Sequence, residues 1–208
     1  MSPARILALS AVTALAAATC HAQNCGWARI DHEVSYDASG MWNPTVYRSI
    51  ASGLTLAQLG GALWEGSESR FGRTMWQGLD SQIIGGLTAE AGKYIFTRAR
   101  PSQGNNPCLW FQGPSHYSFP SGEATSAAAL VTPYVLEYAH DDPVVYGLLL
   151  LPLYVGAGRI KNQAHWQTDV LTGWAIGGLS GWFAHEQETP LLIRILPHGF
   201  EIGLKASF

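Results

Sequence analysis

The sequence predicts an all-α protein, a bundle of about five or six helices with a small C-terminal β-hairpin. Its 208 residues suit one domain with a sizeable core. Hydrophobic residues make up 47% of the chain and charged residues only 13%, which is about half the usual quarter. Such a chain hides most of its length from water, either in a tight helical core or partly in a membrane.

Five segments are expected to be helical, because turn residues and helix start and stop signals bound them. They are Arg48–Trp64, Thr74–Ala99, Ser121–His140, Val144–Ala157 and Trp166–Ala184. Pro101 ends the second segment, because helical geometry is disfavoured for the residue before a proline. The tail Leu191–Phe208 instead carries apolar residues at every second position on either side of a Pro-His-Gly turn, which predicts the hairpin.

Two apolar runs raise the question of a membrane. Val144–Ala157 has 14 residues and Val170–Ala184 has 15, whereas a membrane-spanning helix needs ~20. These runs fit buried core helices, or short helices that dip into a membrane surface. We favour a core bundle and keep membrane association as the alternative. The formal charge of −3 gives no indication of a nucleic-acid surface.

The first residues resemble an export signal. Arg5 precedes the apolar run Ile6–Ala18, and small residues follow at cleavage positions. Residues 1–22 are therefore expected to be a signal peptide, and residues 23–208 a single helical domain in the periplasm. A lipoprotein modified at Cys20 and an ordinary apolar N-terminal helix are the alternatives.

Cleavage of this signal leaves two cysteines, Cys25 and Cys108. In an oxidising compartment such a pair is expected to form a disulfide, which ties the N-terminal arm to the loop 101–120. Two unpaired thiols are the alternative.

Three separated segments carry side chains that can hold and attack a phosphate group. In the first, Lys93 and Arg100 lie seven residues apart, about two helical turns, so both are expected on one face near the end of a helix. An arginine fork and a lysine charge can bind a phosphate together. A solvated basic face is the alternative, and the neighbouring Arg98 has no evident role.

The second segment is Pro120-Ser121-Gly122-Glu123, a turn that leads into a helix. Ser121 is a good N-cap, Gly122 lets a backbone N–H approach a ligand, and the first-turn N–H groups form an anion site. A capped helix with no ligand is the alternative.

The third segment contains Arg159, His165 and Asp169. His165 and Asp169 lie four residues apart and therefore share a helix face. An aspartate that accepts a hydrogen bond from one ring nitrogen leaves the other nitrogen free as a nucleophile. Arg159 can clamp the same phosphate. A surface His/Asp pair is the alternative.

In this order, Lys-x6-Arg-Pro, Pro-Ser-Gly and Arg-x5-His-x3-Asp resemble the motifs of the type 2 phosphatidic acid phosphatase superfamily. That superfamily includes lipid phosphate phosphatases, bacterial acid phosphatases and vanadium haloperoxidases. The resemblance implies that His165 attacks phosphorus to form a phosphohistidine and that Asp169 orients it. It implies no metal and no cofactor. The residues that it assigns to phosphate binding are Lys93, Arg100, Ser121, Gly122 and Arg159.

Glu123 departs from this pattern, because the second motif of the family ends in a histidine that acts as general acid. The helix N-terminus favours an ionised Glu123, whereas a bound phosphate dianion favours the protonated form, which can donate a proton. We expect an active enzyme with Glu123 as the acid, and an impaired site is the alternative. His116, in the preceding loop, is a reserve acid.

The function expected from these residues is that of an exported phosphatase of phosphomonoesters or pyrophosphates. A lipid-linked substrate is favoured, because low charge and many tryptophans suit an amphiphile at a membrane surface. Isoprenyl phosphates, phosphatidate-type lipids and lipid A are candidates. The alternatives are a soluble non-specific acid phosphatase, a phosphate- or phospholipid-binding protein without turnover, and a haloperoxidase that holds vanadate.

Overall fold

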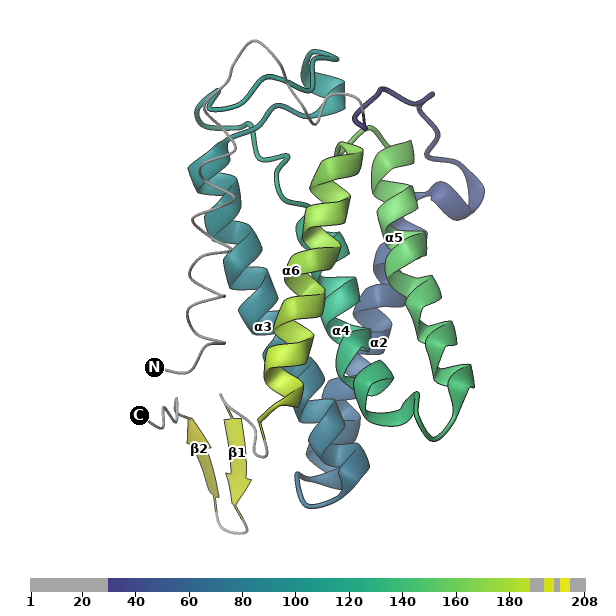
Figure 1. Ribbon diagram of the computed structural model, residues 1–208, viewed down its shortest axis with the longest axis vertical. Helices are drawn as coiled ribbons and strands as arrows, with labels where there is room; N and C mark the ends of the chain where they lie inside the picture. The colour runs from purple at the N-terminus through teal and green to yellow at the C-terminus, as the bar shows by residue number, and fades with distance from the viewer. Residues whose placement is uncertain (1–29, 188–192, 197–198, 203–208) are drawn as a thin grey trace.

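The computed structural model describes residues 30–187, 193–196 and 199–202 of the chain. Figure 1 shows five α-helices that run side by side along the long axis of the molecule. The predicted all-α bundle is therefore confirmed for the described residues. The helices are α2 (Pro44–Glu65), α3 (Arg70–Phe96), α4 (Gly122–Tyr138), α5 (Leu150–Lys161) and α6 (Gln167–His185).

The helix ends follow local capping signals. Helix α2 begins at Pro44, earlier than expected, because the Asn43 side chain accepts a hydrogen bond from the N–H of Thr45. Helix α3 begins after Ser69, whose hydroxyl accepts from the N–H of Gly72 at 3.0 Å. The same helix ends at Phe96, before the expected Ala99.

This early end of α3 corrects one prediction. Thr97 has a left-handed backbone conformation with φ 34°, which stops the helix before Arg98. Arg100 therefore lies outside the helix, in the segment that leads into the short 3-10 helix η3 (Pro101–Gln103). The expectation that Lys93 and Arg100 share a helix face is wrong, and any meeting of the two must come from the path of the loop.

The apolar segment expected over Val144–Ala157 folds as two elements. A 3-10 helix, η4 (Pro143–Leu149), leads directly into α5. The Asp142 side chain caps η4 by accepting from the N–H of Val144 at 3.0 Å. A further 3-10 turn, η2 (Gly40–Trp42), precedes α2.

Helices α4 and α6 pack unusually closely, because glycines line the contact. A β-carbon at Gly177 would lie 2.3 Å from the carbonyl oxygen of Thr125, and one at Gly173 would lie 2.6 Å from that of Ser121. Side chains at these positions would hold the two backbones apart. At the upper end of this contact, the N–H of Ser121 donates to the carbonyl oxygen of Asp169 at 3.0 Å. Close packing thus joins the second and third motifs.

Beyond α6 the structure describes two short antiparallel strands. Strand β1 (Ile193–Leu196) pairs with β2 (Gly199–Ile202), and Ile193 lies opposite Ile202. The remainder of the tail lies outside the described residues, so the full hairpin over Leu191–Phe208 stays a prediction. The signal peptide over residues 1–22 and the Cys25–Cys108 disulfide also stay predictions, because residues 1–29 lie outside the described part of the chain.

Candidate phosphate-binding active site

The three motifs meet at one end of the bundle. In Figure 1 the end of α3, the loop 97–121, the α5–α6 turn and the arm before α2 lie together at the upper end. Backbone hydrogen bonds join these segments: the N–H of Ser118 donates to the carbonyl of Arg98 at 3.0 Å, and the N–H of Ser102 donates to that of Gln163 at 3.2 Å. Residues far apart in the sequence are therefore held in one site.

The His165 imidazole is buried, with 3% of its surface exposed, and its Nδ1 lies 2.6 Å from the carbonyl oxygen of Ser118. A carbonyl only accepts hydrogen bonds, so Nδ1 carries the proton and Nε2 keeps its lone pair. Burial, together with the nearby charges of Arg159, Arg100 and Lys93, holds the pKa of His165 well below its ordinary value of 6.5. The ring is therefore neutral and chemically suited to nucleophilic attack through Nε2.

Asp169 does not hydrogen-bond His165 directly. Its Oδ2 lies 3.8 Å from Nδ1 of the ring, beyond hydrogen-bonding distance. Oδ2 instead accepts from the hydroxyl of Ser118 at 2.5 Å and from the N–H of Trp166 at 2.8 Å, while Oδ1 accepts from Arg98 at 2.5 Å. The i,i+4 spacing places the two residues on one face as expected, but the contact between them runs through Ser118.

The predicted phosphate-binding side chains Lys93, Arg100 and Arg159, here called the cation cluster, come from three different elements. The charges of all three help to lower the pKa of His165, so all three lie near the ring. Burial and the charge of Arg159 lower the pKa of Arg100. Lys93 reaches the start of α4, because a β-carbon at Gly122 would lie 3.1 Å from its Nζ.

Ser121 and Gly122 open α4 beside the cation cluster. The Ser121 side chain is fully buried and caps the helix by accepting from the N–H of Ala124 at 3.5 Å. The absence of a side chain at Gly122 leaves room for the Lys93 ammonium, which also pairs with Glu90 at 2.8 Å. A helix N-terminus beside three cations is a strong anion-binding environment.

Glu123 bridges two arginines. Its Oε2 lies 3.2 Å from Arg159, and its Oε1 lies 3.0 Å from Arg48 of α2. Arg48 was not predicted, because it belongs to no motif and nothing in its local sequence separates it from other surface arginines. His116, the reserve acid, has a buried Nδ1 with no hydrogen-bond partner among the described residues, and no hydrogen bond there joins it to the site.

Comparison with known proteins identifies the family. The profile of the PAP2 superfamily matches residues 78–191, more than half of the chain and all three motifs. The chain belongs to the PAP2 superfamily. The resemblance inferred from the motifs is confirmed.

Among the most similar PAP2 relatives is a lipid A 1-phosphatase of Porphyromonas gingivalis, 37% identical over 105 residues, which are 50% of this chain and 21% of the relative. A lipid A 1-phosphatase of Rhizobium etli is 26% identical over 131 residues, 58% of this chain and 54% of the relative. An undecaprenyl-diphosphatase of Sulfolobus acidocaldarius is 29% identical over 98 residues, 47% of each chain. The matched region spans about a fifth to about half of these relatives.

A solved structure, that of Aquifex aeolicus LpxE, is also similar. It has a TM-score of 0.48 and 18% sequence identity, and the match covers 70% of this chain and 88% of that one.

Around His165, apart from the buried Asp169–Arg98 pair, four cations lie near two carboxylates. Arg48 and the cation cluster supply the positive charges, and Glu90 and Glu123 supply the negative ones. The excess of positive charge leaves capacity for a phosphate dianion beside a neutral imidazole. Among the described residues, no group of three or more histidine, cysteine, aspartate or glutamate side chains is arranged to hold a metal ion.

Proposed function

We propose that the protein is an exported phosphatase that hydrolyses lipid-linked phosphomonoesters or diphosphates through a phosphohistidine on His165. The observation that carries this proposal is the neutral, buried imidazole, whose Nε2 lone pair is free and which has the charges of three cations nearby. Nucleophile and anion-binding groups in one place are what phosphoryl transfer requires, because positioning and charge stabilisation dominate that reaction.

The proposed reaction has two steps. Nε2 of His165 attacks phosphorus, the bond to the leaving oxygen breaks, and that oxygen takes a proton from the Glu123 carboxyl group. A water molecule then attacks the phosphohistidine, the P–N bond breaks, and the proton of the water returns to Glu123. Throughout, the cation cluster balances the charge on the phosphoryl oxygens.

Substrate binding supplies the proton for the first step. Without substrate, the Glu123 carboxylate pairs with Arg48 and Arg159. An incoming phosphate dianion competes for Arg159 and lies beside Glu123, which favours the protonated carboxyl group. The same two ion pairs favour the alternative function, a phosphate- or phospholipid-binding protein without turnover, if Glu123 stays ionised.

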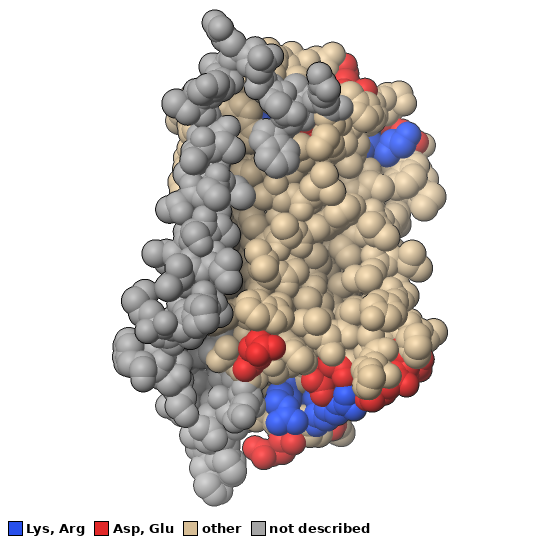
Figure 2. Space-filling view, viewed as in Figure 1, with Lys and Arg blue, Asp and Glu red and all other residues tan. Residues whose placement is uncertain are grey.

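Exposed apolar side chains support a lipid substrate. On the part of the face seen in Figure 2, charged side chains gather near the lower end and the upper right corner, with a wide uncharged band between them. Large apolar side chains that are exposed to solvent occur on all five α-helices of the described residues, among them Leu56 and Trp64 of α2, Leu87 of α3, Leu136 of α4, Leu150 of α5 and Leu179 of α6. Exposed apolar surface on this scale is typical of a protein that contacts a membrane.

One segment has the length and composition of a membrane span. It is Pro143–Lys161, with 19 residues, a mean hydropathy of 1.5 and only 28% of its most apolar window buried. This segment is longer than the 14-residue apolar run Val144–Ala157, because η4 leads directly into α5 and the two form one continuous helical segment. We propose that the uncharged band lies in a bilayer and that the site opens at the level of the lipid headgroups. This favours a lipid phosphatase over a soluble acid phosphatase.

The test is phosphate release by the full-length protein in detergent. The substrates are an isoprenyl diphosphate, a phosphatidate, lipid A and p-nitrophenyl phosphate, each with and without a chelator. We expect release from at least one lipid, no effect of the chelator, and a loss of at least ~10³-fold in His165→Ala. His140→Ala, in the exposed turn after α4, is the matched control and should retain wild-type activity.

Three outcomes would contradict the proposal. Phosphate binding without release from any substrate would establish the binding protein instead. Release from p-nitrophenyl phosphate alone, without dependence on detergent, would establish the soluble variant. A His165→Ala protein as active as wild type would exclude the phosphohistidine.

A further inference from the structure

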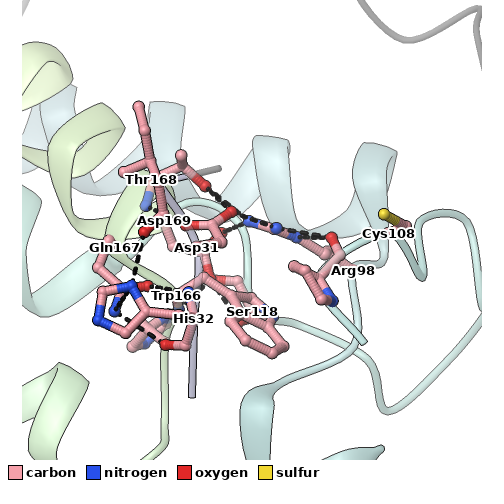
Figure 3. Close-up of polar contacts among 12 residues, drawn as sticks. Asp31, His32, Arg98, Cys108, Ser118, Trp166, Gln167, Thr168 and Asp169 are labelled. Carbon is pink, nitrogen blue, oxygen red and sulfur yellow. Dashed lines mark hydrogen bonds and ion pairs between the residues drawn. The ribbon is translucent and has the colours of Figure 1, made fainter. Parts of the chain in front are cut away.

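A buried charged cluster lies beside His165 and joins Asp169 of the third motif to residues to which no motif assigns a role. It consists of Asp31, Arg98, Thr168 and Asp169, here called the Arg98 cluster. The Arg98 guanidinium is 1% exposed and lies between two carboxylates, 2.6 Å from Asp31 Oδ2 and 2.5 Å from Asp169 Oδ1. Figure 3 shows Asp31, Thr168 and Asp169 gathered around this guanidinium.

The guanidinium of Arg98 is fixed in orientation. Its NH2 and Nε atoms also donate to the carbonyl oxygen of Pro107, at 2.6 and 3.1 Å. Its Cζ lies 4.4 Å from the ring centroid of Trp110 and 5.6 Å from that of Trp166, within range of cation–π attraction. A planar guanidinium group with this many partners has one favoured orientation. A lysine ammonium group could not make the same set of contacts.

Asp31 connects this cluster to the N-terminal arm. Its Oδ1 accepts from the N–H of Thr168 at 2.8 Å, and its Oδ2 accepts from the Thr168 hydroxyl at 2.6 Å and from Arg98. The arm is docked beside it, because the Gln167 side chain donates to the carbonyl of His32 at 2.9 Å. An aspartate outside every motif therefore holds both Arg98 and the first turn of α6.

Ser118 links the cluster to the nucleophile. Its carbonyl oxygen holds Nδ1 of His165, so the position of that carbonyl sets the direction of the imidazole. Ser118 is itself held twice by the cluster, through its N–H to the carbonyl of Arg98 at 3.0 Å and through its hydroxyl to Asp169 at 2.5 Å.

We propose that Asp31 and Arg98 are positioning residues that fix the reactive direction of His165 through Asp169 and Ser118. The inference rests on the proposed phosphatase function and deepens it. Neither residue is bonded to the cation cluster in the described part of the chain, so loss of Asp31 should leave phosphate binding intact and slow the chemical step. A misdirected nucleophile loses rate because the reacting atoms leave the near-attack geometry.

The experiment separates chemistry from binding. For wild type, Asp31→Asn, Thr168→Val and the control Glu33→Gln, we would measure kcat and KM on the best substrate of the panel. The affinity and stoichiometry of inorganic phosphate would be measured by calorimetry, because the stoichiometry counts folded sites. Glu33 is a matched control, since it is an exposed carboxylate on the same arm whose side chain, among the described residues, bonds only Gln163.

For Asp31→Asn we expect kcat to fall about 10- to 100-fold, with KM, phosphate affinity and phosphate stoichiometry within about threefold of wild type. Thr168→Val keeps the side-chain shape and removes only one hydroxyl, so its kcat should fall about 3- to 10-fold. Glu33→Gln should match wild type.

Several outcomes would overturn the inference. An unchanged kcat in a folded Asp31→Asn protein would do so, as would a loss of rate that merely follows a lower phosphate stoichiometry. If Asp31→Asn does not fold, the isosteric Thr168→Val decides, and an unchanged kcat there overturns the proposal. A wild-type protein that binds phosphate but releases none from any substrate would instead overturn the phosphatase function itself, and the inference with it.

Discussion

The two sides of the site differ in burial and in how completely their polar atoms are bonded. On the nucleophile side, the side chains of His165, Asp169 and Arg98 are all at most 3% exposed, and each is hydrogen-bonded or ion-paired. On the side where we place the leaving group, Arg48 is 53% and Glu123 34% exposed.

On the second of these two sides, two buried side-chain atoms lack a hydrogen-bond partner among the described residues. They are the Nε atom of Arg159 and the Oε2 atom of Glu123, although Oε2 is ion-paired. Orphaned buried donors are costly unless a ligand satisfies them. In the proposed mechanism the nucleophile is therefore set before substrate arrives, whereas phosphate completes the contacts of the groups around Glu123. The predictions below test this division.

The largest effect is expected for Glu123. Glu123→Gln keeps the shape and removes the proton donor, so hydrolysis of an alkyl or isoprenyl phosphate should fall about 10²-fold or more. The loss should be smaller for p-nitrophenyl phosphate, whose leaving group needs little protonation. The measurement is the pH–rate profile of both proteins on both substrates.

Glu123→His restores the residue that the family pattern has at this position and should recover part of the rate. If Glu123→Gln equals wild type on the alkyl substrate at every pH, Glu123 is not the acid, and the side that contains it would lose its assigned role.

A second effect, of about tenfold at pH 5.5, is expected in the pH dependence of kcat/KM. Attack requires a neutral His165, and an ordinary imidazole loses about tenfold in its neutral fraction per pH unit below its pKa. The pKa of His165 is well below 6.5, so the fall of kcat/KM on the acid side of the pH profile should begin below pH 6.5. Activity should therefore persist at pH values where an ordinary histidine would be protonated.

The acid limb is best measured in Glu123→Gln, where residue 123 no longer titrates. The rates would be corrected for the second ionisation of the substrate phosphate, which lies near 6. A limb centred at 6.5 or above would show that His165 is solvated and not preorganised, which contradicts the buried geometry.

Local sequence signals predicted most of the helices and the motif residues. Capping residues, prolines and apolar segments are short-range features, so α2, α3, α4 and α6 were located to within about four residues. The order and spacing of Lys93, Arg100, Arg159 and His165 led us to expect that they meet in one place, and the three charges do lie near the His165 ring; their joint action stays a prediction. The end of α3 was placed too late, because no sequence signal marks Thr97 as left-handed.

The missed residues are those whose role depends on tertiary contacts. Arg98 was set aside as a basic residue without a role, yet it is buried between Asp31 and Asp169. Asp31 lies in an arm with no periodic pattern, and Arg48 belongs to no motif, so neither had a local signal of its role. One signal was available for Arg98: in a chain with only 13% charged residues, a charged residue in a segment rich in apolar and aromatic side chains is a candidate for burial.

The smallest effect is expected for Arg48. Its ion pair with Glu123 joins two partly exposed side chains, 3.0 Å apart, and such pairs contribute little. Arg48→Ala should lower kcat/KM by about two- to fivefold at low ionic strength. The difference should shrink at ~1 M salt, where the screening length falls to about 3 Å. Arg73→Ala, near the opposite end of α3, is the control for a general change in charge and should have no effect.

The size of the Arg48 effect also tests the division between the two sides of the site. A loss of more than about 100-fold, insensitive to salt, would mean that Arg48 contacts the phosphoryl group in the transition state. Arg48 would then act as a fourth member of the cation cluster, and the more open side of the site would be as preorganised as the nucleophile side. A small, screened effect would leave Arg48 as an exposed partner that holds Glu123 until phosphate displaces it.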